Sequence, residues 1–153
     1  MLKTFATICI IGMFTSSCTS KKASRTEGSH EAEQDLTMIV GTYTSGDSKG
    51  LYSFRFNEEN GTATALSEAE VENPSYLVPS ADGKFIYAVS EFSNEQAAAN
   101  AFAFNKEEGT FRLLNTQKTG GEDPCYIITN GSNVVTANYS GGSISVFPID
   151  KDG

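Results

Sequence analysis

Short apolar runs that alternate with polar residues fill the chain from residue 38 onward, and Gly, Asn and Asp residues separate them. The period of two is typical of half-buried β-strands, and no window shows the 3.6-residue period of a helix. The alanine run at 97–99 is too short for a stable helix and is expected to belong to an inserted loop. The pattern predicts an all-β domain with strands near residues 38–44, 50–56, 62–70, 75–80, 84–91, 99–105, 110–117, 125–129, 132–139 and 143–149.

The predicted strands recur with a regular spacing. Phe54, Phe102 and Phe147 occupy the same position in three segments, each of which ends in an acidic, Gly-containing turn. These phenylalanines are 48 and 45 residues apart, and a second segment, residues 74–78, returns 50 residues later at 124–128. A period of about 40 to 50 residues is typical of the four-stranded blades of a β-propeller.

The strands fill fewer than three such blades. The middle repeat supplies four strands, the first lacks a strand before residue 38, and the last lacks its fourth strand. Closed propellers have about four to eight blades, and an incomplete one leaves unpaired edges. We therefore expect residues 37–153 to form the N-terminal part, roughly two and a half blades, of a truncated propeller. A small self-contained sandwich of the same strands is the alternative.

The first eighteen residues have the pattern of a secretory signal. Lys3 precedes an apolar run at 5–14, and small residues then lead to Cys18. The run is about half of the roughly 20 apolar residues that a spanning helix needs, so residues 1–18 are expected to be a lipoprotein signal peptide. The small residues resemble a bacterial lipobox, which makes Cys18 the expected lipidation site. Thr15 stands where a lipobox commonly has Leu, so secretion with cleavage elsewhere is the alternative.

A polar segment, residues 19–36, follows the signal and is rich in Ser, Lys, Glu and Gln. So few large apolar residues cannot offset the entropy cost of ordering the backbone, and we expect a disordered tether between membrane and domain. The only histidine, His30, lies in this tether, with no second His or paired Cys nearby, so no metal site is expected. These features predict a location in the bacterial cell envelope, lipid-anchored on the periplasmic side or at the outer membrane.

Charge and cysteine content narrow the function further. The formal net charge is -8, and because nonspecific nucleic-acid binding depends on Lys and Arg, we exclude nucleic acid as a partner. Cys125 is the only cysteine left once Cys9 leaves with the signal and Cys18 takes lipid, so no intramolecular disulfide is expected. Cys125 follows Pro124 and begins an apolar stretch, which predicts a small buried strand residue and not a nucleophile.

Six motifs follow one another along the domain: Gly41-Thr42-Tyr43-Thr44, Gly50-Leu51-Tyr52, Asn73-Pro74-Ser75-Tyr76-Leu77, the run 82–91, Pro124-Cys125 and Asn138-Tyr139-Ser140-Gly141-Gly142-Ser143. Together they resemble the bacterial propeller lactonases, which include 6-phosphogluconolactonase and are related to muconate-cyclising enzymes. The resemblance implies a seven-bladed propeller, of which roughly four blades lie outside this chain, and a sugar lactone as substrate, with no cofactor. The Gly-rich residues 140–143 precede a strand, so a hairpin turn is expected there and not a phosphate loop.

The implied chemistry points to strand ends at one mouth of the propeller channel. Hydrolysis of a ring ester needs a base that activates water and donors that stabilise the oxyanion. Glu91 ends an otherwise apolar strand and is the expected acid/base group, with a solvated loop carboxylate as the alternative. Asn138 is expected to bind substrate or to hold a turn, and Tyr43 and Tyr139 to line the channel or to pack between blades. Tyr126 stands where members of the family often carry histidine, so no histidine base is assumed.

Three functions remain. The first is a carbohydrate lactonase, 6-phosphogluconolactonase-like, exported to the envelope, where an unphosphorylated lactone is a more accessible substrate. The second is a noncatalytic propeller lipoprotein that binds glycan or protein at the cell surface, since one fold hosts many functions. The third is a cyclase that acts on an unsaturated diacid, which would need cations, and only Lys84 and Lys118 lie near the relevant strands.

Overall fold

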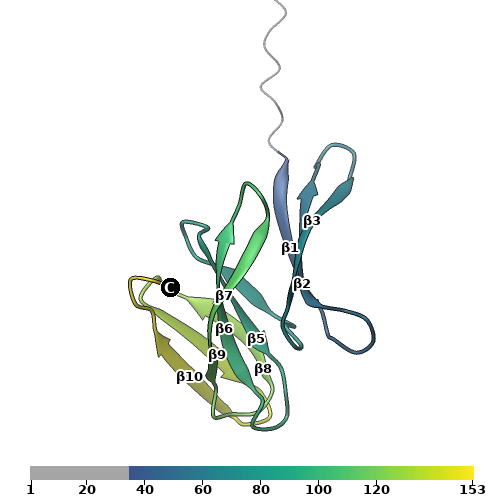
Figure 1. Ribbon diagram of the computed structural model, residues 1–153. Helices are drawn as coiled ribbons and strands as arrows, with labels where there is room; N and C mark the ends of the chain where they lie inside the picture. Colours follow the sequence, from purple (N-terminus) through teal and green to yellow (C-terminus); the bar gives the residue numbers. More distant parts are fainter. Residues whose placement is uncertain (1–34) are drawn as a thin grey trace, which may run out of the picture. The chain divides into compact units, whose positions relative to one another are not determined.

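The computed structural model describes residues 35–153 (Figure 1). The described residues form ten strands and no helix, which confirms the all-β prediction. The strands are β1 (Leu36–Gly41), β2 (Gly50–Phe56), β3 (Ala63–Glu70), β4 (Leu77–Pro79), β5 (Phe85–Ser90), β6 (Ala98–Asn105), β7 (Thr110–Lys118), β8 (Pro124–Thr129), β9 (Asn133–Asn138) and β10 (Ser143–Pro148).

Most of the N-terminal predictions lie outside the described residues. These are the signal peptide, the lipidation site Cys18 and the tether as far as residue 34. Leu36, the last residue of the predicted tether, is already the first residue of β1 and pairs with Phe56. Within residues 35–153, no helix is long and apolar enough to cross a membrane.

The strands make three antiparallel sheets, with the orders β1-β2-β3, β4-β5-β6-β7 and β10-β9-β8. The arrangement of three, four and three strands is the one that the sequence repeat predicts. Figure 1 shows β1, β2 and β3 as a group apart from the strands of the other two sheets, which overlap in this view. A two-sheet sandwich is therefore not formed.

The repeat is present in the backbone geometry as well as in the sequence. The β2–β3 ladder shifts register between Ser53 and Phe54, and the β6–β7 ladder shifts between Ala101 and Phe102, 48 residues later. In the turn after each of β2 and β6, an Asn side chain, Asn57 or Asn105, accepts two backbone N–H groups. Each bulge adds one residue on one strand and bends it, so the two sheets acquire the same local twist.

The core lies on both faces of the middle sheet. Ile86 and Ala88 of β5 pack with Leu51 of the first sheet, whereas Tyr87 and Val89 pack with Ile127 of the third. Successive strand residues point to opposite faces, so the apolar run of β5 covers two neighbours at once. Full burial of each large side chain contributes about 2 kcal/mol of transfer free energy. The middle sheet is thereby held between its neighbours as a propeller blade is.

Two local predictions were wrong. Cys125 is exposed, because the β8–β9 register shifts between Pro124 and Tyr126 and leaves Cys125 as the unpaired residue of a bulge. The alanines do not form an inserted loop, since Ala98 and Ala99 begin β6 and are buried. β6 is a central strand, paired with β5 and β7, and the small alanine side chains fit in this buried position. The hairpin predicted at 140–143 is confirmed, with the Gly142 N–H donating to the Tyr139 carbonyl at 3.2 Å.

Candidate functional site

Three of the predicted site residues follow equivalent strands. Tyr43 comes two residues after β1, Glu91 comes directly after β5, and Tyr139 directly after β9, with 48 residues between successive members. The structure brings two of them together, since the Tyr43 hydroxyl donates a hydrogen bond to Glu91 Oε2 at 2.9 Å. The first and second sheets therefore share one polar group at this end of their strands.

Ser75 completes the group, although its role was not predicted. Its hydroxyl donates a short hydrogen bond to the same Oε2 atom of Glu91. Ser75 lies just before β4, where the fully buried Pro74 anchors the chain. We call Tyr43, Ser75 and Glu91 the carboxylate triad. A signal for Ser75 was present in the sequence, because it occupies in the second repeat the position of Cys125 in the third.

The carboxylate has one oxygen held and one oxygen open. Both hydroxyl donors contact Oε2, and among residues 35–153 no donor is found for Oε1. Glu91 itself is half-buried. Two O–H donors on one oxygen orient the carboxylate, and the second oxygen keeps its lone pairs available to accept a hydrogen bond. This is the geometry that a general base requires.

The carboxylate also controls the ionisation of Tyr43. The hydrogen bond to Glu91, followed by burial and by the negative charge of Glu91, raises the pKa of the Tyr43 phenol. The phenol therefore stays protonated at neutral pH and acts as a donor. Its single hydrogen is used by Glu91.

Asn138 and Tyr139 have different surroundings. Asn138 is 2% exposed, its Nδ2 donates to Ser143 at 3.1 Å and to Ser145 at 2.9 Å, and its Oδ1 accepts from Thr136 at 3.0 Å. These bonds use the amide inside the third sheet, which favours the turn-holding alternative over substrate binding. Tyr139 is 81% exposed and does not pack between the described sheets.

Two further tyrosines lie next to the triad. Tyr76 and Tyr126, which follow Ser75 and Cys125, have ring centroids 4.8 Å apart at an interplanar angle of 52°. Each is 42% exposed. Tyr126 stands at the position where the family named above often has histidine. Its ring packs against the ring of Tyr76, which precedes β4 of the second sheet. The two tyrosines are 50 residues apart in the sequence, which indicates equivalent positions in successive repeats.

The two cations considered for a cyclase lie at opposite ends of the middle sheet. Lys84 lies in the turn before β5, and the six residues of that strand separate it from Glu91 by about 23 Å. Its ammonium pairs with Asp82 at 3.2 Å. Lys118 ends β7 and pairs with Ala98, which in turn pairs with Ser90, so Lys118 lies two strands across from the end of β5. The ammonium of Lys118 donates to the Gln96 carbonyl at 3.5 Å, and no hydrogen bond joins either lysine to the triad among residues 35–153.

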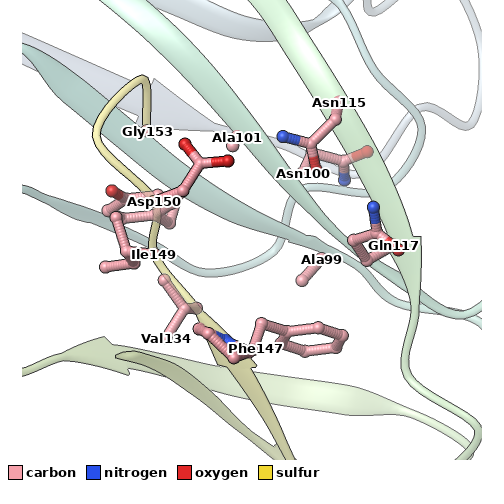
Figure 2. A pocket seen from close by; sticks show the side chains of 12 residues that line it. Ala99, Asn100, Ala101, Asn115, Gln117, Val134, Phe147, Ile149, Asp150 and Gly153 are labelled. Carbon is pink, nitrogen blue, oxygen red and sulfur yellow. The ribbon is translucent and has the colours of Figure 1, made fainter. Parts of the chain in front are cut away.

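A hollow of about 440 Å³ lies elsewhere, between the second and third sheets. Figure 2 shows its amide side chains, Asn100, Asn115 and Gln117, on one side and Asp150 on another. It contains none of the predicted site residues. The last strands of the first two sheets, β3 and β7, contact each other. The third sheet has no equivalent strand among residues 35–153 to pack against β7 in the same way. The hollow is thus a space between sheets, and we assign no ligand to it.

No group of three His, Cys, Asp or Glu side chains suited to a metal ion is found in residues 35–153. The chemistry available at the triad is that of a carboxylate, two hydroxyl groups and the nearby tyrosines.

Comparison with known proteins identifies the wider group. The 6-phosphogluconolactonase of Bacillus subtilis is 37% identical over 120 residues, which are 74% of this chain and 33% of the relative. A crystal structure from Bacteroides fragilis, of a protein provisionally named 6-phosphogluconolactonase, is 70% identical with a TM-score of 0.78, and the match covers 80% of this chain and 35% of that one. The periplasmic gluconolactonase of Pseudomonas aeruginosa is 29% identical with a TM-score of 0.71, over 77% and 36% of the two chains.

The chain therefore spans about a third of the length of these relatives. The sequence profile described as "Lactonase, 7-bladed beta-propeller" matches residues 37–153. This match agrees with the three stacked sheets and confirms an incomplete portion of a seven-bladed fold. The chain belongs to the lactonase family of seven-bladed β-propellers.

Proposed function

We propose that the protein hydrolyses a sugar lactone and that Glu91 is the base of the reaction. The observation that carries this proposal is the carboxylate triad, in which Tyr43 and Ser75 hold one oxygen of Glu91 and leave the other open. The names of the Bacillus subtilis and Pseudomonas aeruginosa relatives support the substrate class, a lactone of gluconate with or without a phosphate.

In the proposed reaction, a water molecule donates a hydrogen bond to Glu91 Oε1 and attacks the ring carbonyl carbon. Glu91 takes the proton as the water oxygen bonds to carbon, the carbonyl oxygen becomes an oxyanion, and its collapse breaks the ring C–O bond. The proton then passes to the leaving alkoxide. The hydrogens of Tyr43 and Ser75 are used by Oε2, so the oxyanion must be stabilised by donors outside the triad.

The experiment compares Glu91→Gln with wild type in the protein expressed from its complete gene, with glucono- and 6-phosphoglucono-lactone as substrates and acid release as the measurement. Glutamine keeps the shape and cannot take the proton, so kcat should fall about 10² to 10⁴-fold. Glu95→Gln is the matched control, because Glu95 is an exposed carboxylate in the loop between β5 and β6.

Undiminished activity in Glu91→Gln would place the base elsewhere. A folded wild-type protein that hydrolyses neither lactone would contradict the lactonase proposal and favour the noncatalytic, surface-binding propeller.

We also propose that the protein is exported and anchored to the envelope through lipid on Cys18. The support is the signal-like pattern of residues 1–18 and the periplasmic location in the name of the Pseudomonas aeruginosa relative. Cys18→Ala should release the protein from the membrane fraction, whereas Cys9→Ala, in the apolar run, should leave it there. Membrane association that survives Cys18→Ala would refute lipidation at this residue.

A further inference from the structure

Asn73 contacts every segment that supplies a member of the carboxylate triad. It lies in the connection between β3 and β4, two residues before Ser75. Its side-chain Oδ1 accepts hydrogen bonds from Thr44 N at 3.1 Å and from Thr44 Oγ1 at 3.0 Å. Thr44 follows Tyr43 directly, so these bonds fix the segment that carries the phenol.

The same residue holds Glu91 on its other side. Asn73 Nδ2 donates to the Glu91 carbonyl at 3.3 Å, and the Asn73 carbonyl accepts the Glu91 N–H at 3.0 Å. The Asn73 carbonyl also accepts the N–H of Ser75 at 2.8 Å. One residue thus joins the segments after β1, before β4 and after β5.

The backbone of Asn73 is in a conformation that few residues adopt. Its φ is 48°, in the left-handed region, where Asn is more frequent than most other non-glycine residues. Such a conformation costs of order 1 kcal/mol and persists where the surroundings over-determine it. Here the hydrogen bonds on both sides of the residue supply that constraint.

We propose that Asn73 is a positioning residue that aligns Tyr43 and Ser75 on the carboxylate of Glu91. This inference rests on the proposed function only for its effect on catalysis. The Tyr43–Glu91 hydrogen bond spans two sheets that are connected by no ladder, and the side chain of Asn73 is the hydrogen-bonding bridge between the segments that carry them.

The third sheet contains a counterpart that serves as a control. Asp123 has φ 51°, its carbonyl accepts Tyr139 N–H at 2.9 Å, and its Oδ1 accepts from Ser93 Oγ at 2.7 Å. Hydrogen bonds from the Ser140 and Ser93 side chains lower the pKa of this carboxyl. Asp123 therefore repeats the backbone geometry of Asn73 without a side-chain bond to Thr44 or Glu91.

The test is Asn73→Gly beside Asp123→Gly in the protein expressed from its complete gene. Glycine keeps the left-handed backbone in both and removes only the side chain. If Asn73 positions the triad, Asn73→Gly should lower kcat about a hundredfold with little change in KM, since a misplacement of about 1 Å has effects of that size. Asp123→Gly removes a side chain that holds Ser93, two residues after Glu91, and contacts no member of the triad, so it should lower kcat by clearly less than Asn73→Gly does.

A second readout does not depend on activity. The pKa of Tyr43 is obtained from tyrosinate absorbance, as the difference between each variant and the same variant with Tyr43→Phe. Asn73→Gly should move it down towards that of a free phenol, and Thr44→Ala should move it in the same direction by less. Restoring the acceptor with Asn73→Asp should recover part of the alignment, since Asp also accepts from Thr44.

An unchanged Tyr43 pKa in a folded Asn73→Gly protein would overturn the proposal, as would an equal effect of Asp123→Gly. If the wild type hydrolyses neither lactone, the proposed function fails while the Tyr43 titration still decides the role of Asn73. Should Asn73→Gly not fold, the Thr44→Ala titration decides it, and an unchanged Tyr43 pKa there counts against the proposal.

Discussion

Glu91 and Tyr139 occupy equivalent positions in neighbouring repeats, yet their side chains have very different surroundings. Glu91 is half-buried and accepts two hydroxyl hydrogens, whereas Tyr139 is 81% exposed. The repeated backbone therefore supplies equivalent positions. The residue type at each position decides whether its side chain can take part in a reaction. The carboxylate at residue 91 meets a phenol from one sheet and a serine from its own.

The residue-scale prediction concerns the acidity of Tyr43. The hydrogen bond to Glu91 raises the pKa of the phenol, because ionisation would place two negative charges on one hydrogen-bonded pair. Removing the charge with Glu91→Gln should therefore lower the Tyr43 pKa, measured as tyrosinate absorbance relative to the corresponding Tyr43→Phe protein. Glu95→Gln, an exposed carboxylate in the following loop, should leave the titration where it is. A Tyr43 titration that does not move in Glu91→Gln would show that the hydrogen bond is not formed in solution.

At the scale of strands and loops, one glycine sets the distance between two segments of the site. A Cβ placed on Gly41, the last residue of β1, would lie 2.0 Å from the carbonyl oxygen of Pro74. Side chains keep about 3 Å or more from a backbone oxygen, and backbone cannot turn aside as a flexible side chain can. Gly41 thus allows the end of β1, which leads to Tyr43, to touch the loop that carries Ser75.

The element-scale prediction is that Gly41→Ala separates these two segments. The forced shift should lower the free energy of unfolding by about 1 to 3 kcal/mol, read from denaturant unfolding. It should also lower lactone hydrolysis, because Ser75 would move away from Glu91. Ser132→Ala, in the exposed turn before β9, is the matched control and should change stability by less than about 0.5 kcal/mol. A Gly41→Ala protein as stable and active as wild type would contradict the close approach.

At the scale of the molecule, the middle sheet packs against a neighbouring sheet on each of its two faces. The first and third sheets each have one such neighbour among residues 35–153, and the third sheet also has an exposed edge strand. β10 is the edge of the third sheet, and its Ile144 and Val146 are 69% and 55% exposed. An edge of unpaired backbone N–H and C=O groups with apolar side chains is a template for pairing with another strand. The net charge of the whole chain, -8, opposes association only weakly at moderate salt.

The molecule-scale prediction is that the polypeptide 35–153 alone associates with itself as its concentration rises. Sedimentation velocity should show the association, and lysines at Ile144 and Val146 should suppress it by placing charge on the edge. Lysines at Ser45 and Ser132, two exposed loop positions, add the same charge away from the edge and should not suppress it. Equal suppression by both pairs would mean that net charge, and not the β10 edge, governs association.

Much of the fold was determined by local sequence. The period-two alternation predicted every strand, and the spacing of Phe54 and Phe102 predicted two equivalent sheets. The structure adds that the two sheets have a bulge at the same site. These features depend on a few neighbouring residues, through side-chain alternation and turn chemistry, and are therefore readable along the chain.

Two features of the site were decided by tertiary structure. Alternation predicts which face of a sheet a residue occupies, but not which connecting loop will reach it, so the contact of Ser75 with Glu91 was not predicted. Cys125 is exposed because an extra residue at the start of β8 breaks the alternation on which its predicted burial rested. The sequence by itself determined the strands, their repeat and the position of Glu91 at a strand end. Only the tertiary structure placed Tyr43, Asn73 and Ser75 against Glu91, because those contacts join residues that are far apart in the chain.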